Sequence, residues 1–173
     1  KDVKGLFKSA VASNNPTAII SHAKLLGVEG EVPEEDLTIE LGSGAVSRLG
    51  MDVSLIASSI SVIAALEAAD ILSNNGVDAE VIDLRTLNPL DKSIIIESVQ
   101  KTGRAVIVDE TNESCGVAAE ISAIISESTF ETLKSPIRRV TRPNVPVPAS
   151  PLLEKCLEIT PERIVSAVKE IIG

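Results

Sequence analysis

The sequence predicts an α/β fold with three layers, in which helices cover both faces of a mostly parallel sheet. Short segments with the two-residue period of a strand alternate with longer segments whose apolar residues recur every three or four positions. Such alternation of strands and helices is typical of a parallel sheet. Of the 173 residues, 44% are apolar but only 1% are aromatic, so the core must be built from aliphatic side chains.

Residues 1–26 are interpreted as the end of a preceding α/β domain. Apolar residues recur at helical spacing over 2–13, and the NNP sequence at 14–16 ends that helix. Residues 17–20 predict a short apolar strand. Because this helix and strand have no obvious partners nearby in the sequence, we expect the rest of their domain to precede Lys1.

Residues 27–42 are predicted to form an acidic linker. Six carboxylates lie between Glu29 and Glu40, and no basic residue accompanies them. Such a run stays solvated and is extended by its own charge repulsion.

Residues 43–173 are predicted to form the second domain, whose helix ends carry clear signals. Asp91 and Thr160 are suited to cap the first turns of helices, and Pro161 fits the first helical position. Gly76 and Gly103 fit the left-handed position that follows a helix. The expected strands are 45–48, 53–58, 79–85, 105–108 and 137–141, and the expected helices are 61–74, 92–102, 117–127 and a last one that begins near 161.

The composition excludes several classes of partner. The net charge of −9 argues against nucleic acids and anionic membranes, which need a basic surface. No apolar run approaches the ~20 residues of a membrane span. Cys115 and Cys156 lie far apart, and with His22 as the only histidine no zinc constellation is expected.

Ligands of such sheets bind beyond the carboxyl ends of the strands, so functional residues are expected there. No nucleophile elbow, P-loop or dinucleotide fingerprint occurs in these turns. His22 is interpreted as structural. Asp109 and Glu110 are neighbours in a strand and point to opposite faces, so they cannot act as a pair, and we expect Glu110 to cap or pair at the sheet edge. Asp83 and Arg85 share a face and can form a salt bridge or meet a partner chain.

Arg138, Arg139 and Arg142 form a small basic cluster on an otherwise acidic chain. They are candidates for contact with an acidic partner, although their stems can equally cover apolar surface. The proline-rich turn at 143–151 is expected to be stiff and to hold a fixed docking surface. Spacing alone therefore favours a binding or assembly module over an enzyme.

Five segments nevertheless resemble one enzyme family in order and spacing. Over nearly its whole length the chain resembles the carboxyl-terminal half of the beta subunit of thiamine-dependent 2-oxoacid dehydrogenases, of the pyruvate dehydrogenase type, which ends in a domain of the transketolase C-terminal type. The matching segments are DVKGLFKSAVASNNP (2–16), EGEVPEED (29–36), EVIDLRTLNPLD (80–91), SVQKTGRAVIVDE (98–110) and VPVPASPLLE (145–154).

The resemblance implies a place in a larger enzyme. In that family two alpha and two beta subunits form a heterotetramer that docks on a lipoyl acyltransferase core. The first beta domain supplies a glutamate that activates thiamine diphosphate, and the alpha subunit holds the diphosphate through magnesium. By this resemblance the chain lacks that glutamate, binds neither cofactor alone, and serves subunit assembly and docking. It would work in the bacterial cytoplasm, or in the mitochondrial matrix or plastid of a eukaryote.

The resemblance also implies a potassium site. Its positions are Ala10, Val11, Ser13 and Asn15, where backbone carbonyls supply part of the shell. The family usually has an aspartate where Ser13 stands.

Several departures from the family fall in the turns at the carboxyl edge. The family usually has an arginine at the position of Ile60, a glycine-tryptophan-arginine stretch at 111–113, and an aromatic residue at the position of Ala149. These differences favour the alternative of an assembly module without catalysis. A second alternative, part of a deoxyxylulose-phosphate synthase or transketolase-like enzyme, comes from the segment DLRTLNPLD (83–91), which also resembles the synthase pattern. A small-molecule sensor that uses the same edge is a further hypothesis, supported by the fold alone.

Overall fold

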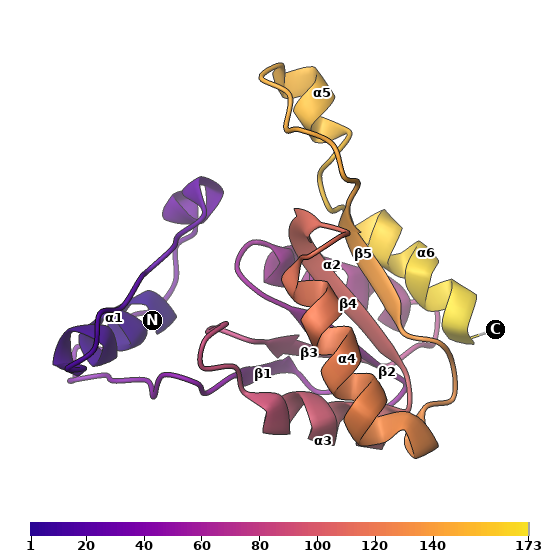
Figure 1. The fold of residues 1–173 in the computed structure, drawn as a ribbon, viewed down its shortest axis with the longest axis horizontal. Helices are drawn as coiled ribbons and strands as arrows, with labels where there is room; N and C mark the ends of the chain where they lie inside the picture. The colour runs from indigo at the N-terminus through magenta and orange to yellow at the C-terminus, as the bar shows by residue number, and fades with distance from the viewer. Residues whose placement is uncertain (173) are drawn as a thin grey trace.

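A computed structural model describes residues 1–172 and confirms the three layers around one mixed sheet (Figure 1). The sheet has the order β1-β3-β2-β4-β5. Strands β2 to β5 run parallel to their neighbours, and only β1 runs antiparallel, against β3. The strands are β1 (Ala45–Arg48), β2 (Val53–Ala57), β3 (Ala79–Asp83), β4 (Ala105–Asn112) and β5 (Arg138–Arg142).

The helices divide between the two faces of the sheet. One face is covered by α2 (Ser61–Ser73) and α6 (Pro161–Ile172), and the other by α3 (Lys92–Thr102) and α4 (Val117–Thr129). Central strand β2 is buried throughout. Its Leu55 packs in the core beneath α2 and α6, whereas Ile56 packs in the core beneath α3 and α4, as the alternation of a strand requires.

The predicted helix ends are confirmed at their caps. Asp91 Oδ1 accepts a hydrogen bond from the backbone N–H of Ile94 at 3.2 Å, and Thr160 Oγ1 accepts one from that of Arg163 at 3.4 Å. Gly103 follows α3 with a φ of 74°, in the left-handed region that a residue with a side chain rarely adopts.

The amino-terminal part of the chain lies to one side of the sheet (Figure 1). It contains α1 (Asp2–Ala12) and a single 3₁₀ turn, η1 (Ala23–Gly27). Residues 33–39 run along α1: the ammonium of Lys4 donates to the Pro33 carbonyl at 2.5 Å, and the N–H of Ile39 donates to the Gly5 carbonyl at 3.3 Å.

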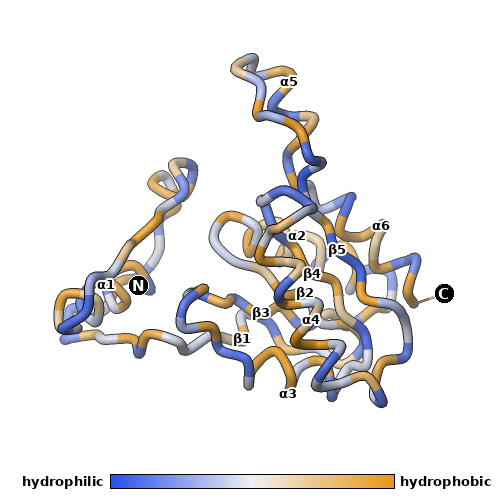
Figure 2. Tube along the Cα trace, in the orientation of Figure 1, coloured by the Kyte–Doolittle hydropathy of each residue, from blue (hydrophilic) through white to orange (hydrophobic). Residues whose placement is uncertain are grey.

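Apolar side chains also lie outside the core. In Figure 2 the colouring marks apolar residues along α1 and along the short helix α5 (Pro151–Lys155), and Figure 1 shows that α5 projects from the sheet. Phe7 and Leu152 are 55% and 77% exposed. Within residues 1–172, no helix combines the length and apolar character needed to cross a membrane.

The structure corrects four predicted elements. Residues 17–20 form no strand, because no neighbouring strand pairs with them. Strand β3 ends at Asp83 and not at 85, since Arg85 takes a φ of 55° that breaks the extended backbone. Strand β4 continues to Asn112, which pairs with Arg142. The turn at 143–151 leads into the unpredicted helix α5. A second short 3₁₀ turn, η2 (Phe130–Thr132), follows α4.

Candidate functional site at the carboxyl edge of the sheet

The four parallel strands bring their carboxyl ends to one edge of the sheet. Strands β3 and β4 lie on opposite sides of β2 in the sheet. The chain therefore turns in opposite directions after β2 and after β4. Ligands of open α/β sheets bind in the crevice at such a point. Ser59 and Cys115 lie in these two turns with φ angles of 55° and 59°, a conformation that costs a non-glycine residue about 1 kcal/mol or more.

Glu110 pairs at the sheet edge, as predicted. Its Oε1 lies 3.2 Å from Nη2 of Arg142 on the neighbouring strand β5 and 3.6 Å from Nε2 of His22. The side chain of Glu110 is 25% exposed. The carboxylate is therefore engaged by two basic groups and is not a free base.

Asp109 plays a different role from its neighbour, as the alternation along β4 predicts. Its buried carboxylate accepts hydrogen bonds from the N–H of Thr111 at 3.1 Å, from the hydroxyl of Thr111 at 2.5 Å and from the N–H of Ala118 at 3.1 Å. These bonds tie the end of β4 to the start of α4. Asp109 thus positions backbone and does not face the crevice as an acid.

A second charge pair lies next to the first. The ammonium of Lys24 donates a hydrogen bond to Oε1 of Glu158 at 2.5 Å. This bond raises the pKa of Lys24 and lowers the pKa of Glu158. Neither residue stands out in the sequence, because no motif relates positions 24 and 158.

Arg85 forms its ion pair with a different partner from the one considered in the sequence. Its Nη2 lies 3.0 Å from Oδ1 of Asp2 on α1, while only its backbone N–H donates to Asp83, at 2.9 Å. Burial raises the pKa of Asp83, and the hydrogen bond and charge of Arg85 only partly oppose that shift. Arg85 therefore fastens α1 to the sheet edge.

The three arginines of the basic cluster each pair within the chain. Arg138 lies 3.2 Å from Glu170, Arg139 lies 3.7 Å from Glu113, and Arg142 pairs with Glu110. Their charges are thus balanced locally. Their contact with an acidic partner stays a prediction.

The four positions implied for potassium lie at the end of α1. The Ala10 carbonyl already accepts a hydrogen bond from the N–H of Ser13 at 3.3 Å, and the Ser13 hydroxyl accepts one from the N–H of Asn15 at 3.2 Å. Val11 is 70% exposed. The oxygen atoms available as ligands at these positions are neutral, and neutral oxygens suit potassium. The potassium site stays a prediction.

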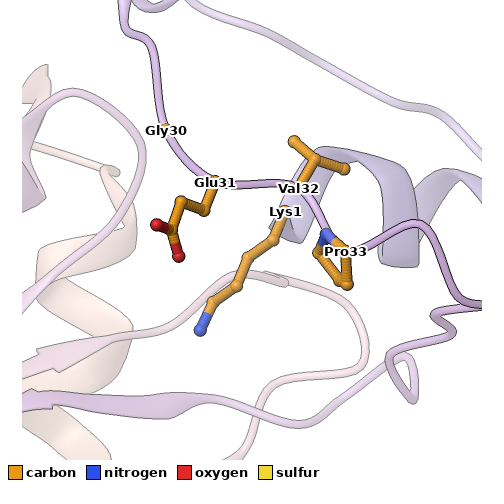
Figure 3. Close-up of a pocket in the computed structure, with 5 residues that line it drawn as sticks. All are labelled: Lys1, Gly30, Glu31, Val32 and Pro33. Atoms are coloured by element: carbon orange, nitrogen blue, oxygen red, sulfur yellow. The ribbon is translucent and has the colours of Figure 1, made fainter.

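A large hollow lies away from the sheet edge. It has a volume of about 830 Å³ and lies between Lys1 and residues 30–33, with Lys1 and Glu31 as its charged groups (Figure 3). Across residues 1–172, no three histidine, cysteine, aspartate or glutamate side chains group to hold a metal ion. The hollow brings together no nucleophile and base.

These observations define a class of protein: an α/β scaffold whose edge carboxylates are taken up by ion pairs and backbone hydrogen bonds, with exposed apolar side chains on the helices beside it. The chain belongs to the family described as the transketolase C-terminal domain, whose model matches residues 42–164.

Several curated relatives are named as beta subunits. The chain is 43% identical over 172 residues to the acetoin:2,6-dichlorophenolindophenol oxidoreductase subunit beta of Bacillus subtilis, which covers 99% of this chain and 50% of that protein. It is 45% identical over 150 residues to the pyruvate dehydrogenase E1 component subunit beta of the same organism, which covers 86% and 46%. The chain thus spans about half the length of the curated relatives it matches.

A solved structure shows the same fold. It is described as a split gene transketolase in an inactive beta4 tetramer, and it superposes with a TM-score of 0.71 at 30% sequence identity. The match covers 83% of this chain and 46% of that one. The predicted family resemblance and fold class are confirmed.

Proposed function

We propose that this chain forms the assembly half of the beta subunit of a thiamine-dependent 2-oxoacid dehydrogenase of the acetyl-transferring type. The observation that carries this proposal is the 45% identity to a pyruvate dehydrogenase beta subunit. In this reading, residues 1–26 close the cofactor-contacting domain, residues 27–42 link the domains, and residues 43–173 form the domain that shapes the subunit contact.

The carboxylates at the carboxyl edge of the sheet indicate which part of the enzyme activates the cofactor. In the complete enzyme, thiamine diphosphate would supply the nucleophilic carbon for the substrate carbonyl, and magnesium would bind the diphosphate. The carboxylates of this chain's edge are occupied by Arg142, His22 and backbone N–H groups. We therefore assign cofactor activation to residues outside this chain, and subunit contact and docking to this chain.

The partners we propose are an alpha subunit, a second beta subunit and a lipoyl acyltransferase core. The exposed apolar side chains of α1 and α5 supply surface of the kind that subunit contacts bury. Arg138 and Arg139 lie on the edge strand β5 and are 46% and 31% exposed, so they can reach an acidic partner.

The test uses the complete beta subunit with its alpha partner, thiamine diphosphate and magnesium. We expect reduction of dichlorophenolindophenol with pyruvate, and none when thiamine diphosphate is left out. Acetoin is the second substrate to try, because the name of one relative includes it. Sugar phosphates test the transketolase-like alternative. Absence of thiamine-dependent turnover with every 2-oxoacid would remove the proposal.

The partner role is tested separately by charge reversal. We expect Arg138→Glu with Arg139→Glu to weaken assembly with the alpha subunit or the acyltransferase core, as measured by sedimentation velocity. Lys92→Glu reverses an exposed charge on α3 and serves as the matched control. Equal sedimentation of the two variants would contradict a role for the basic cluster.

A second candidate is an assembly module without catalysis. It is favoured by the solved relative described as an inactive beta4 tetramer and by the altered turns at Ile60, 111–113 and Ala149. This candidate predicts that the chain self-associates or binds its alpha partner while the complete subunit pair turns over no substrate. A strictly monomeric chain that binds no partner would exclude it.

A further inference from the structure

Residues 22–27 form a short segment that is here called the strap. It contains the 3₁₀ turn η1, and no residue of that turn is buried. His22 caps the 3₁₀ turn η1: its Nδ1 accepts a hydrogen bond from the N–H of Lys24 at 3.2 Å. The carbonyl of His22 accepts a second bond from the N–H of Leu25 at 3.0 Å. None of the residues of η1 is buried, and Leu26 is 81% exposed. Of the apolar residues of the strap only Leu25 is partly buried, so apolar packing contributes little to holding the strap in place.

The strap meets the sheet edge through charged and polar groups. Nε2 of His22 lies 3.6 Å from Glu110 at the end of β4, and Lys24 donates to Glu158, which follows α5, at 2.5 Å. Nδ1 is used within the turn, so Nε2 is the ring nitrogen that lies toward Glu110. The strap thus contacts two residues that follow it by more than 80 positions in the sequence, Glu110 in β4 and Glu158 after α5.

Carboxylates outnumber basic groups around Lys24, and the basic groups Lys155 and Arg142 also act on its partner Glu158. Glu110, Glu154 and Glu158 all act on its ammonium and favour its charged form. Arg142 is the one basic group that shares Glu110 with the strap. A positive strap therefore faces a negative corner of the domain, and partly exposed pairs of this kind contribute up to about 1 kcal/mol each and weaken in salt.

We propose that the strap is an electrostatic latch that closes over the carboxyl ends of β4 and β5 and opens as a unit when its charge pairs are lost. Its main contact is Lys24 with Glu158, and His22 against Glu110 orients it. When the strap opens, Glu110 and Arg142 become accessible at the edge where α/β sheets bind their ligands. This inference rests on the contacts of the chain and not on the proposed enzyme activity.

Hydrogen exchange of the full chain, read by mass spectrometry on peptides that cover 20–28, tests the latch. We expect Lys24→Glu and Glu158→Lys each to speed exchange in these peptides about fivefold, since a loss of about 1 kcal/mol changes an opening equilibrium by that factor. The double variant Lys24→Glu with Glu158→Lys restores the pair with its charges exchanged. Its exchange should return toward that of the unchanged chain.

Two controls separate the latch from general effects. Glu113→Lys reverses a charge on the same edge that pairs with Arg139 and not with the strap, so it should leave exchange in 20–28 unchanged. Raising the salt concentration should speed exchange in the unchanged chain but not in Lys24→Glu. The proposal is wrong if the two single variants exchange like the unchanged chain, if the double variant exchanges as fast as the singles, or if Glu113→Lys has the same effect.

Discussion

The buried pair between Glu80 and Lys101 offers the sharpest test of how this domain is held together. Glu80 lies on β3 with its side chain 2% exposed, and Lys101 of α3, 33% exposed, contacts it. We expect Lys101→Met to leave the buried carboxylate of Glu80 without its basic partner. Removing one partner of a buried pair costs about 3–5 kcal/mol. Because a third of Lys101 is open to water, we expect a cost at or just below the lower end of that scale, about 2–3 kcal/mol.

Urea unfolding followed by circular dichroism at 222 nm measures this loss. Fluorescence is of no use, because the chain contains no Trp and no Tyr. With a slope of about 2 kcal/mol per molar urea, the midpoint should fall by about 1 M or more. The double variant Glu80→Gln with Lys101→Met removes the charge itself and should recover much of the loss.

Lys92→Met is the matched control. Lys92 lies exposed at the start of the same helix, so its replacement should shift the midpoint by much less. A loss below about 1 kcal/mol in Lys101→Met, or an equal loss in the control, would refute the reasoning that an unpaired charge is what destabilises the variant.

Three further outcomes follow from the packing. Gly50→Ala should lose about 3 kcal/mol in thermal unfolding, because the new Cβ would lie 2.2 Å from the carbonyl carbon of Ala79; a loss below about 1 kcal/mol would contradict this. Ser54→Ala should lose about 1–3 kcal/mol in urea, since its buried hydroxyl has two hydroxyl partners at 2.7 and 2.8 Å; unchanged stability would show that those bonds contribute nothing net. Burial raises the pKa of Asp83, so its ionised form is disfavoured in the folded state. Asp83→Asn should therefore be the more stable form at neutral pH, and the difference should vanish as the pH falls and Asp83 becomes protonated. A gap that widens in acid would show the opposite sign.

The fold was predictable where short stretches of sequence decide the structure. The continuous apolar run at 105–108 marks a strand that is buried on both faces. Asp91 and Gly103 mark the two ends of one helix by local hydrogen bonding and backbone freedom. Each of these features depends on residues a few positions away in the sequence, and the structure contains each of them as predicted.

Other elements depend on which segments meet in space, and the sequence does not record that. Residues 17–20 are apolar enough for a strand but find no ladder partner. The period of 45–48 predicts a strand without revealing that it runs antiparallel to β3. Ser150 and Pro151 carried a usable signal for α5, since proline favours the first turn of a helix, but the dense prolines around it favoured a stiff turn.

The candidate site also contains features that the sequence predicts and features that it does not. The position of Glu110 at the end of a buried strand was sufficient to predict a pairing at the edge. Its partner His22 could not be predicted, because the path of the linker at 27–42 decides where the strap lies. Asp2, which pairs with Arg85 in place of Asp83, was hidden for the same reason.

The division of the core between two helical layers has a consequence for synthesis on the ribosome. The layer of α3 and α4 is complete once residues up to 137 have emerged, because its members all precede that point. The layer of α2 needs Ile164, Val168 and Ile171 of α6 to cover it. At about 5–20 residues per second, the nascent chain presents the bare face of α2 for a few seconds after the other half has formed. During that interval the nascent chain exposes the largest apolar surface to a chaperone.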